Sequence, residues 1–198
     1  IGLLTEVIQD FHKPTTKIKK TNLVVYLDAP VAMDLLGVSG KEAAANILPI
    51  IQKIQEIGGT IRIFRASINE LQGALDAVLR RSPPERTGET AGAIRRNEVL
   101  EAYVRQVAHD PNTFLADYKV AISERTLDQF PNEHEYFDRD AYDAFFGKLI
   151  WHHEMPRREH DAAIIAHVMR MRRGIQSRDL FQTRHILLTR NALLCESA

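Results

Sequence analysis

The feature that most constrains the fold is a continuous run of β-branched and aliphatic residues at 22–27, which ends directly at Asp28. Such a run is typical of a strand buried on both faces, as in a parallel sheet. Apolar residues at helical spacing follow at 40–57, an alternating strand pattern at 60–65, and a second helix at 67–79. We therefore expect an α/β fold, with a central parallel sheet flanked by helices and right-handed crossovers.

The middle of the chain shows helical rather than strand periodicity. Helices are predicted at 91–109, 112–129 and 139–151, and Asp110 with Pro111 fits the start of the second one. Together they form a predicted helical insertion over about 81–150. A further helix at 158–173 and a strand at 185–189 return the chain to the sheet.

The domain boundaries follow from composition. Residues 1–20 end in a basic, Pro-containing stretch and are expected to form an N-terminal segment or linker, whereas residues 21–198 form the α/β domain. Because the chain starts at Ile1 rather than Met, we expect it to be a piece of a longer protein.

Charge and cysteine content exclude little. Lys+Arg and Asp+Glu both number 26, so a surface for an anionic polymer must be a local patch. Cys195 has no internal disulfide partner, which favours a reducing compartment, and the cytoplasm is the expected location. No apolar run approaches the roughly 20 residues of a membrane helix, so no membrane partner is expected.

Three acidic residues stand at the ends of predicted elements. Asp28 follows the first strand, where ligands bind in open parallel sheets, although an aspartate there also caps backbone N–H groups. Glu70 fits a capping box with Ser67, and Asp161 lies where the helix dipole favours any carboxylate. Each residue alone therefore has a purely structural interpretation.

Taken together, the three acids suggest a metal site. Converging carboxylates repel one another unless a cation neutralises them. Mg²⁺ and Mn²⁺ take such oxygen ligands and also accept phosphate oxygens, which suits phosphodiester chemistry. Lys and Arg side chains would guide the phosphate backbone, and Arg172, Arg173 and Arg190 lie near these acids in the sequence.

Four segments together resemble the PIN-like nuclease domain family: VVYLDAPVAMDLL at 24–36, SINEL at 67–71, REHDAAIIAHVMRMR at 158–172 and ILLTRNALL at 186–194. The resemblance implies a parallel sheet with acids clustered at the carboxyl ends of its strands. It also implies hydrolysis of single-stranded RNA through a water activated by Mg²⁺ or Mn²⁺.

The resemblance assigns roles to individual residues. Asp28, Glu70 and Asp161 match the catalytic, metal-binding acids, and Asn191 matches a weaker fourth ligand or a water-orienting group. Thr189 belongs to the same late Thr-x-Asn stretch and, with the arginines named above, is expected to bind substrate.

Other functions remain open at this stage. A PIN-like scaffold that binds RNA or protein without catalysis is one, because Ala29 and Pro30 replace the polar residues that often follow the first acid. A DNA nuclease is another, and the His160-Asp161 dipeptide also suggests an HD-type metal phosphohydrolase or a zinc site. An inhibitor protein, a fused domain or a second copy of the chain is a possible protein partner.

Overall fold

The computed structural model describes residues 21–126, 133–150, 154–175 and 182–197. The segment expected at residues 1–20 lies outside this described part. None of the helices in the described ranges combines the length and apolar character needed to cross a bilayer.

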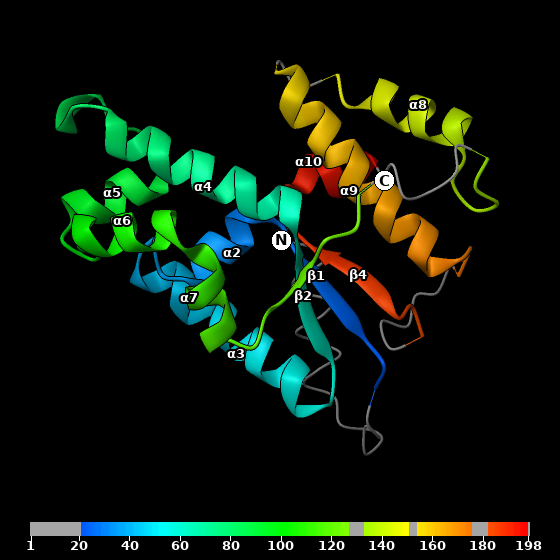
Figure 1. Cartoon of the computed structure of the whole chain (residues 1–198), viewed down its shortest axis with the longest axis horizontal. Coiled ribbons are helices and arrows are strands. Elements are labelled where there is room, and N and C mark those ends of the chain that lie inside the picture. Colours follow the sequence, from blue (N-terminus) through cyan, green and yellow to red (C-terminus); the bar gives the residue numbers. More distant parts are fainter. Residues whose placement is uncertain (1–20, 127–132, 151–153, 176–181, 198) are drawn as a thin grey trace.

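The described residues form a parallel sheet of four strands in the order β3-β2-β1-β4 (Figure 1). Leu27, the last residue of β1, lies beside Ile63 of β2 and Leu188 of β4, so the carboxyl ends of these strands are level. The predicted α/β fold with a central parallel sheet flanked by helices is therefore confirmed. The strands are β1 (Val24–Leu27), β2 (Thr60–Phe64), β3 (Ala121–Ser123) and β4 (His185–Leu188).

Side chains alternate between two faces of the sheet, as strand geometry requires. Val25 and Leu27 of β1 belong to the largest apolar cluster, which includes Ile51 of α3 (Lys41–Glu56). Tyr26 faces the other way and packs with Ile164 of α9 (Met155–Arg172). The sheet is thus covered on both faces, which explains why β1 reads as a continuous apolar run.

Two helices begin directly at the carboxyl ends of strands. After β1, α2 (Ala29–Leu35) starts with Asp28 as its N-cap and Pro30 in its first turn. After β2, α4 (Arg65–Arg80) starts without any loop. The predicted start at Ser67 is therefore wrong, because Ser67 lies inside α4 and is fully buried.

The predicted helical insertion is only partly observed. The helices α5 (Glu89–Arg95), α6 (Glu101–His109) and α7 (Pro111–Asp117) are present, and Asp110 caps α7 as expected. However, β3 occupies part of the predicted helix at 112–129 and joins the edge of the main sheet. Since Val104 and Leu115 also belong to the main apolar cluster, this region is part of the domain core rather than a separate addition.

The last elements build the remaining side of the domain. Helix α8 (Arg139–Lys148) packs against α9, and their cluster contains Phe145, Leu149 and Ile165. Strand β4 then adds to the free side of β1, and α10 (Ala192–Ser197) follows it. As Figure 1 shows, α9 runs beside β4 and brings a late part of the chain next to the first strand.

Candidate metal centre

Asp28 lies at the carboxyl edge of the sheet, between β1 and α2. The Thr189 hydroxyl donates a hydrogen bond of 2.7 Å to Asp28 Oδ2, and the Ala29 amide donates one of 2.8 Å to Oδ1. Only 5% of Asp28 is exposed. Burial is the main cause that raises its pKa from the ordinary value of 3.8 to about 6; the neighbouring acids Glu70 and Asp161 also raise it, and the two hydrogen bonds lower it.

Glu70 reaches the same edge from the second turn of α4. Because α4 begins at Arg65, Glu70 is not the reciprocal member of a capping box, and its carboxylate is free of that role. Its side chain is 36% exposed, so this carboxylate lies between the buried Asp28 and solvent. Since α4 starts before Ser67, the capping box no longer explains why a glutamate stands at position 70.

The third residue of the cluster is His160, on α9. Its Nε2 atom pairs with Glu70 Oε2 at a distance of 2.9 Å, and both atoms are buried. Burial acts to lower the pKa of His160, but contact with Glu70 and the charges of Asp28 and Asp161 outweigh it, so the pKa is raised. A proton on His160 offsets part of the negative charge of this cluster.

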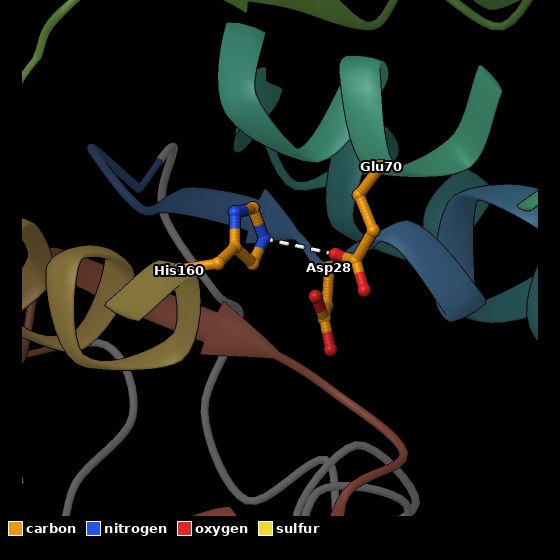
Figure 2. A group of neighbouring side chains, drawn as sticks. All are labelled: Asp28, Glu70 and His160. Atoms are coloured by element: carbon orange, nitrogen blue, oxygen red, sulfur yellow. Dashed lines mark ion pairs between the residues drawn. The ribbon is translucent and has the colours of Figure 1, made fainter. Parts of the chain in front are cut away.

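Asp28, Glu70 and His160 form a group with the geometry of a metal site. One possible ligand atom from each lies within 4.8 Å of the others. Figure 2 shows them converging from β1, α4 and α9, three elements that are far apart in the sequence. We call these three residues the ligand cluster.

Asp161 lies next to the ligand cluster rather than within it. It is buried, and its charge contributes to the raised pKa values of Asp28 and His160. Consecutive residues on a helix point about 100° apart, and of the two it is His160 that pairs with Glu70. The sequence analysis predicted Asp161 as the third metal ligand. The one sequence feature that pointed to His160 was the His160-Asp161 dipeptide.

The late Thr-x-Asn stretch supports the cluster from β4. Thr189 donates to Asp28 and accepts a hydrogen bond of 3.1 Å from the Asn191 amide, so its hydroxyl orients a carboxylate instead of facing substrate. Asn191 Oδ1 accepts a hydrogen bond of 3.2 Å from the Leu194 amide, in the first turn of α10. The structure therefore places Asn191 as a helix cap outside the ligand cluster.

The arginines predicted to bind substrate occupy two different places. Arg190 is held by Asp34, at 2.8 Å, and by Glu89, so its charge is already paired. Arg172 Nε donates to the His185 carbonyl oxygen at the opposite, amino-terminal edge of the sheet. Arg173 follows it in the left-handed region, with φ of 51°. Neither Arg190 nor Arg172 makes a hydrogen bond or ion pair with a member of the ligand cluster in the described part of the chain.

A cavity of about 900 Å³ opens near this edge between α3 and α5. Leu188 and Arg190 line it, together with Gly40 and Glu98, but no member of the ligand cluster does. The cavity is therefore separate from the ligand cluster.

Comparisons of the chain with protein-family models, with curated proteins and with solved structures find no match.

Proposed function

We propose that this protein is a divalent-metal-dependent nuclease that hydrolyses phosphodiester bonds. The observation that carries the proposal is the convergence of Asp28, Glu70 and His160 at the carboxyl edge of a parallel sheet. This edge is where open α/β sheets bind their ligands. The resemblance to PIN-like nucleases favours single-stranded RNA as the substrate.

The donor atoms of the ligand cluster fit a divalent cation. Two carboxylates and an imidazole nitrogen suit Mn²⁺, and the carboxylates alone also suit Mg²⁺. Glu70 Oε2 and His160 Nε2 are buried and face each other at 2.9 Å, so a cation bound between them would take the place of the proton on His160. Burial and the neighbouring acids raise the pKa of Asp28, and a bound cation would oppose this rise by stabilising the ionised carboxylate.

The residues at and around the ligand cluster have distinct roles in the proposed site. Asp28, Glu70 and His160 would hold the cation, and Asp161 would add negative charge beside it. Thr189 keeps the Asp28 carboxylate in one orientation by donating to Oδ2. When bound, the cation would polarise the scissile phosphate and lower the pKa of the attacking water. Glu70, the most exposed member, marks the side from which substrate enters.

Cleavage of labelled single-stranded RNA and DNA tests the proposal. The parent protein is incubated with Mn²⁺, Mg²⁺ or EDTA, and the Asp28→Asn and Glu70→Gln variants are assayed beside it. Asp76→Asn is the matched control, because Asp76 lies on α4 like Glu70 but outside the ligand cluster. We expect metal-dependent cleavage by the parent and the control, and loss of cleavage in both cluster variants.

Equal cleavage by Asp28→Asn and the parent would show that the site is wrong. Absence of cleavage by a folded parent that binds no Mn²⁺ would instead favour a binding scaffold without catalysis. A binding scaffold would be favoured by acids that fail to converge, or by an acid paired with an arginine. Asp28 and Glu70 do converge, and neither pairs with an arginine among the described residues.

The HD-type alternative is less consistent with the structure. HD domains are helical, whereas this chain has a parallel sheet at its centre. Among the described histidines, His160 is in the ligand cluster, and His167 stacks on Phe64 with ring centroids 5.2 Å apart. His152 and His153 lie outside the described residues.

A further inference from the structure

A second charged region lies on the α9 side of the sheet, away from the ligand cluster. Arg62 is in the middle of β2, beside Tyr26, and Arg172 at the end of α9 donates to the His185 carbonyl. Arg184 precedes β4, and its carbonyl accepts from Val24 at the start of β1. Arg125 follows β3. We call the four arginines of this region, Arg62, Arg125, Arg172 and Arg184, the arginine surface.

The charges of these four arginines act on shared neighbours. Burial lowers the pKa of His185 first, and all four arginines lower it further. Burial raises the pKa of Tyr26, while Arg62 and Arg125 oppose this rise. Tyr26 and His185 stack with ring centroids 6.1 Å apart. The four arginines therefore lie around one pair of stacked rings.

Among the described residues, the arginine surface has no acidic counterpart. In the described ranges, no ion pair involves any of its four members, and no carboxylate contributes to the pKa of Tyr26 or His185. Arg62 and Arg172 are half-buried and Arg125 and Arg184 are exposed, and like charges gathered on one surface repel one another unless an anion neutralises them. Arg62 Nε and His185 Nδ1 are also buried without hydrogen-bond partners in the described part of the chain. These observations point to an anion from outside the chain.

We propose that the arginine surface binds the phosphodiester backbone of single-stranded RNA. Guanidinium groups match phosphate geometry and are weakly hydrated, so they are suited to this ligand. The inference rests on the proposed nucleic-acid substrate but does not depend on catalysis. The four-residue strands separate the two sites by only about 10–13 Å, so one strand of RNA can reach both.

Fluorescence anisotropy with a labelled single-stranded RNA, measured in EDTA over a series of salt concentrations, tests the inference. Arg125→Gln/Arg184→Gln is the main variant, because both side chains are exposed and their loss leaves the core intact. Removing two phosphate contacts should reduce the slope of log K against log salt by about 1.4. Affinity at low salt should fall by about tenfold or more.

Arg80→Gln/Arg105→Gln is the matched control, with the same loss of two exposed arginines elsewhere on the surface. It should bind as the parent does. The inference is overturned if the Arg125→Gln/Arg184→Gln variant keeps the parent's affinity and slope, or if the parent binds no RNA. Because EDTA prevents metal-dependent cleavage, the assay measures RNA binding alone. A protein that binds RNA but does not cleave it would therefore support this inference and contradict the proposed catalysis.

Discussion

At the scale of single residues, the charge of Asp28 is the most informative property of the site. Its folded-state pKa of about 6 lies above the ordinary value of 3.8, so the folded protein binds this proton more tightly than the unfolded chain does. Stability is therefore highest when Asp28 is protonated, and it falls as pH rises from about 4 to about 6. A group that costs stability when ionised is typical of functional sites.

We expect Asp28→Asn to stabilise the metal-free protein at pH 7.5. A shift of about two pKa units corresponds to about 3 kcal/mol, which is an upper limit because the amide fits the Ala29 and Thr189 hydrogen bonds less well. Urea denaturation in EDTA measures the effect, with Asp76→Asn as the control. Below about pH 4 the gain should vanish, and a less stable Asn variant at pH 7.5 would contradict this account of the carboxylate.

Thr189 is expected to act on metal binding through Asp28. Thr189→Val removes the hydroxyl that donates to Oδ2, so the pKa of Asp28 rises and Mn²⁺ competes with a proton. Loss of such a supporting group typically weakens metal binding by roughly 10- to 100-fold. Titrations with Mn²⁺ should show a larger deficit at pH 6 than at pH 8, and Thr189→Ser should restore binding. A pH-independent deficit would instead indicate a purely steric effect.

His160 is expected to set the choice of metal. A nitrogen ligand favours Mn²⁺ over Mg²⁺, so His160→Asn should reduce the affinity for Mn²⁺ more than that for Mg²⁺. Competition titrations with both ions measure the ratio of the two affinities. Glu159→Gln, an exposed neighbour on α9, is the control and should leave the ratio unchanged. An unchanged ratio in His160→Asn would remove His160 from the ligand cluster.

At the scale of elements, the start of α4 determines whether Glu70 is available. The Ser67 and Glu70 spacing predicts a capping box, because local signals cannot show that Ser67 will be buried in the core. In the structure α4 begins at Arg65, directly after β2 and before the predicted start at Ser67. Ser67 Oγ has no hydrogen-bond partner among the described residues. Tertiary packing overrides the local cap here.

Two alanine substitutions distinguish a real cap from an apparent one. Ser67→Ala should leave the free energy of unfolding unchanged or slightly increased, because no hydrogen bond is lost. Asp110→Ala should cost about 1 kcal/mol, because Asp110 accepts from the Thr113 amide at the start of α7. Urea denaturation of both variants provides the comparison. A cost for Ser67→Ala as large as that for Asp110→Ala would restore the capping box.

The strand β3 shows why a short element is difficult to predict from the sequence. Its three residues lie within a stretch whose periodicity predicts one helix, but α7 ends at Asp117 and Lys119 then takes a positive φ of 57°. Pairing with β2 stabilises β3, and such pairing is not visible in local periodicity. In contrast, β1 and β2 carry long signals of their own, and both were predicted correctly.

At the scale of the whole molecule, charge is separated although the sum is zero. Acids gather at the carboxyl edge of the sheet, whereas Arg172 and Arg184 of the arginine surface lie at the amino end of β4. Composition cannot show this separation, since it depends on which strands are neighbours. The sequence predicted Asp28 and Glu70 at the site because both end a strand or follow one closely. It missed the role of His160, which depends on how α9 is rotated against α4.

Mn²⁺ binding by the metal-free protein tests the central claim, the metal site, most directly. Isothermal titration of the parent, Asp28→Asn, Glu70→Gln and Asp76→Asn at pH 7.5 compares the cluster with its control. We predict about one Mn²⁺ per chain for the parent and for Asp76→Asn, with binding lost or strongly weakened in the two cluster variants. Equal Mn²⁺ binding by all four proteins, or none by the folded parent, would contradict the assignment of the ligand cluster as a metal centre.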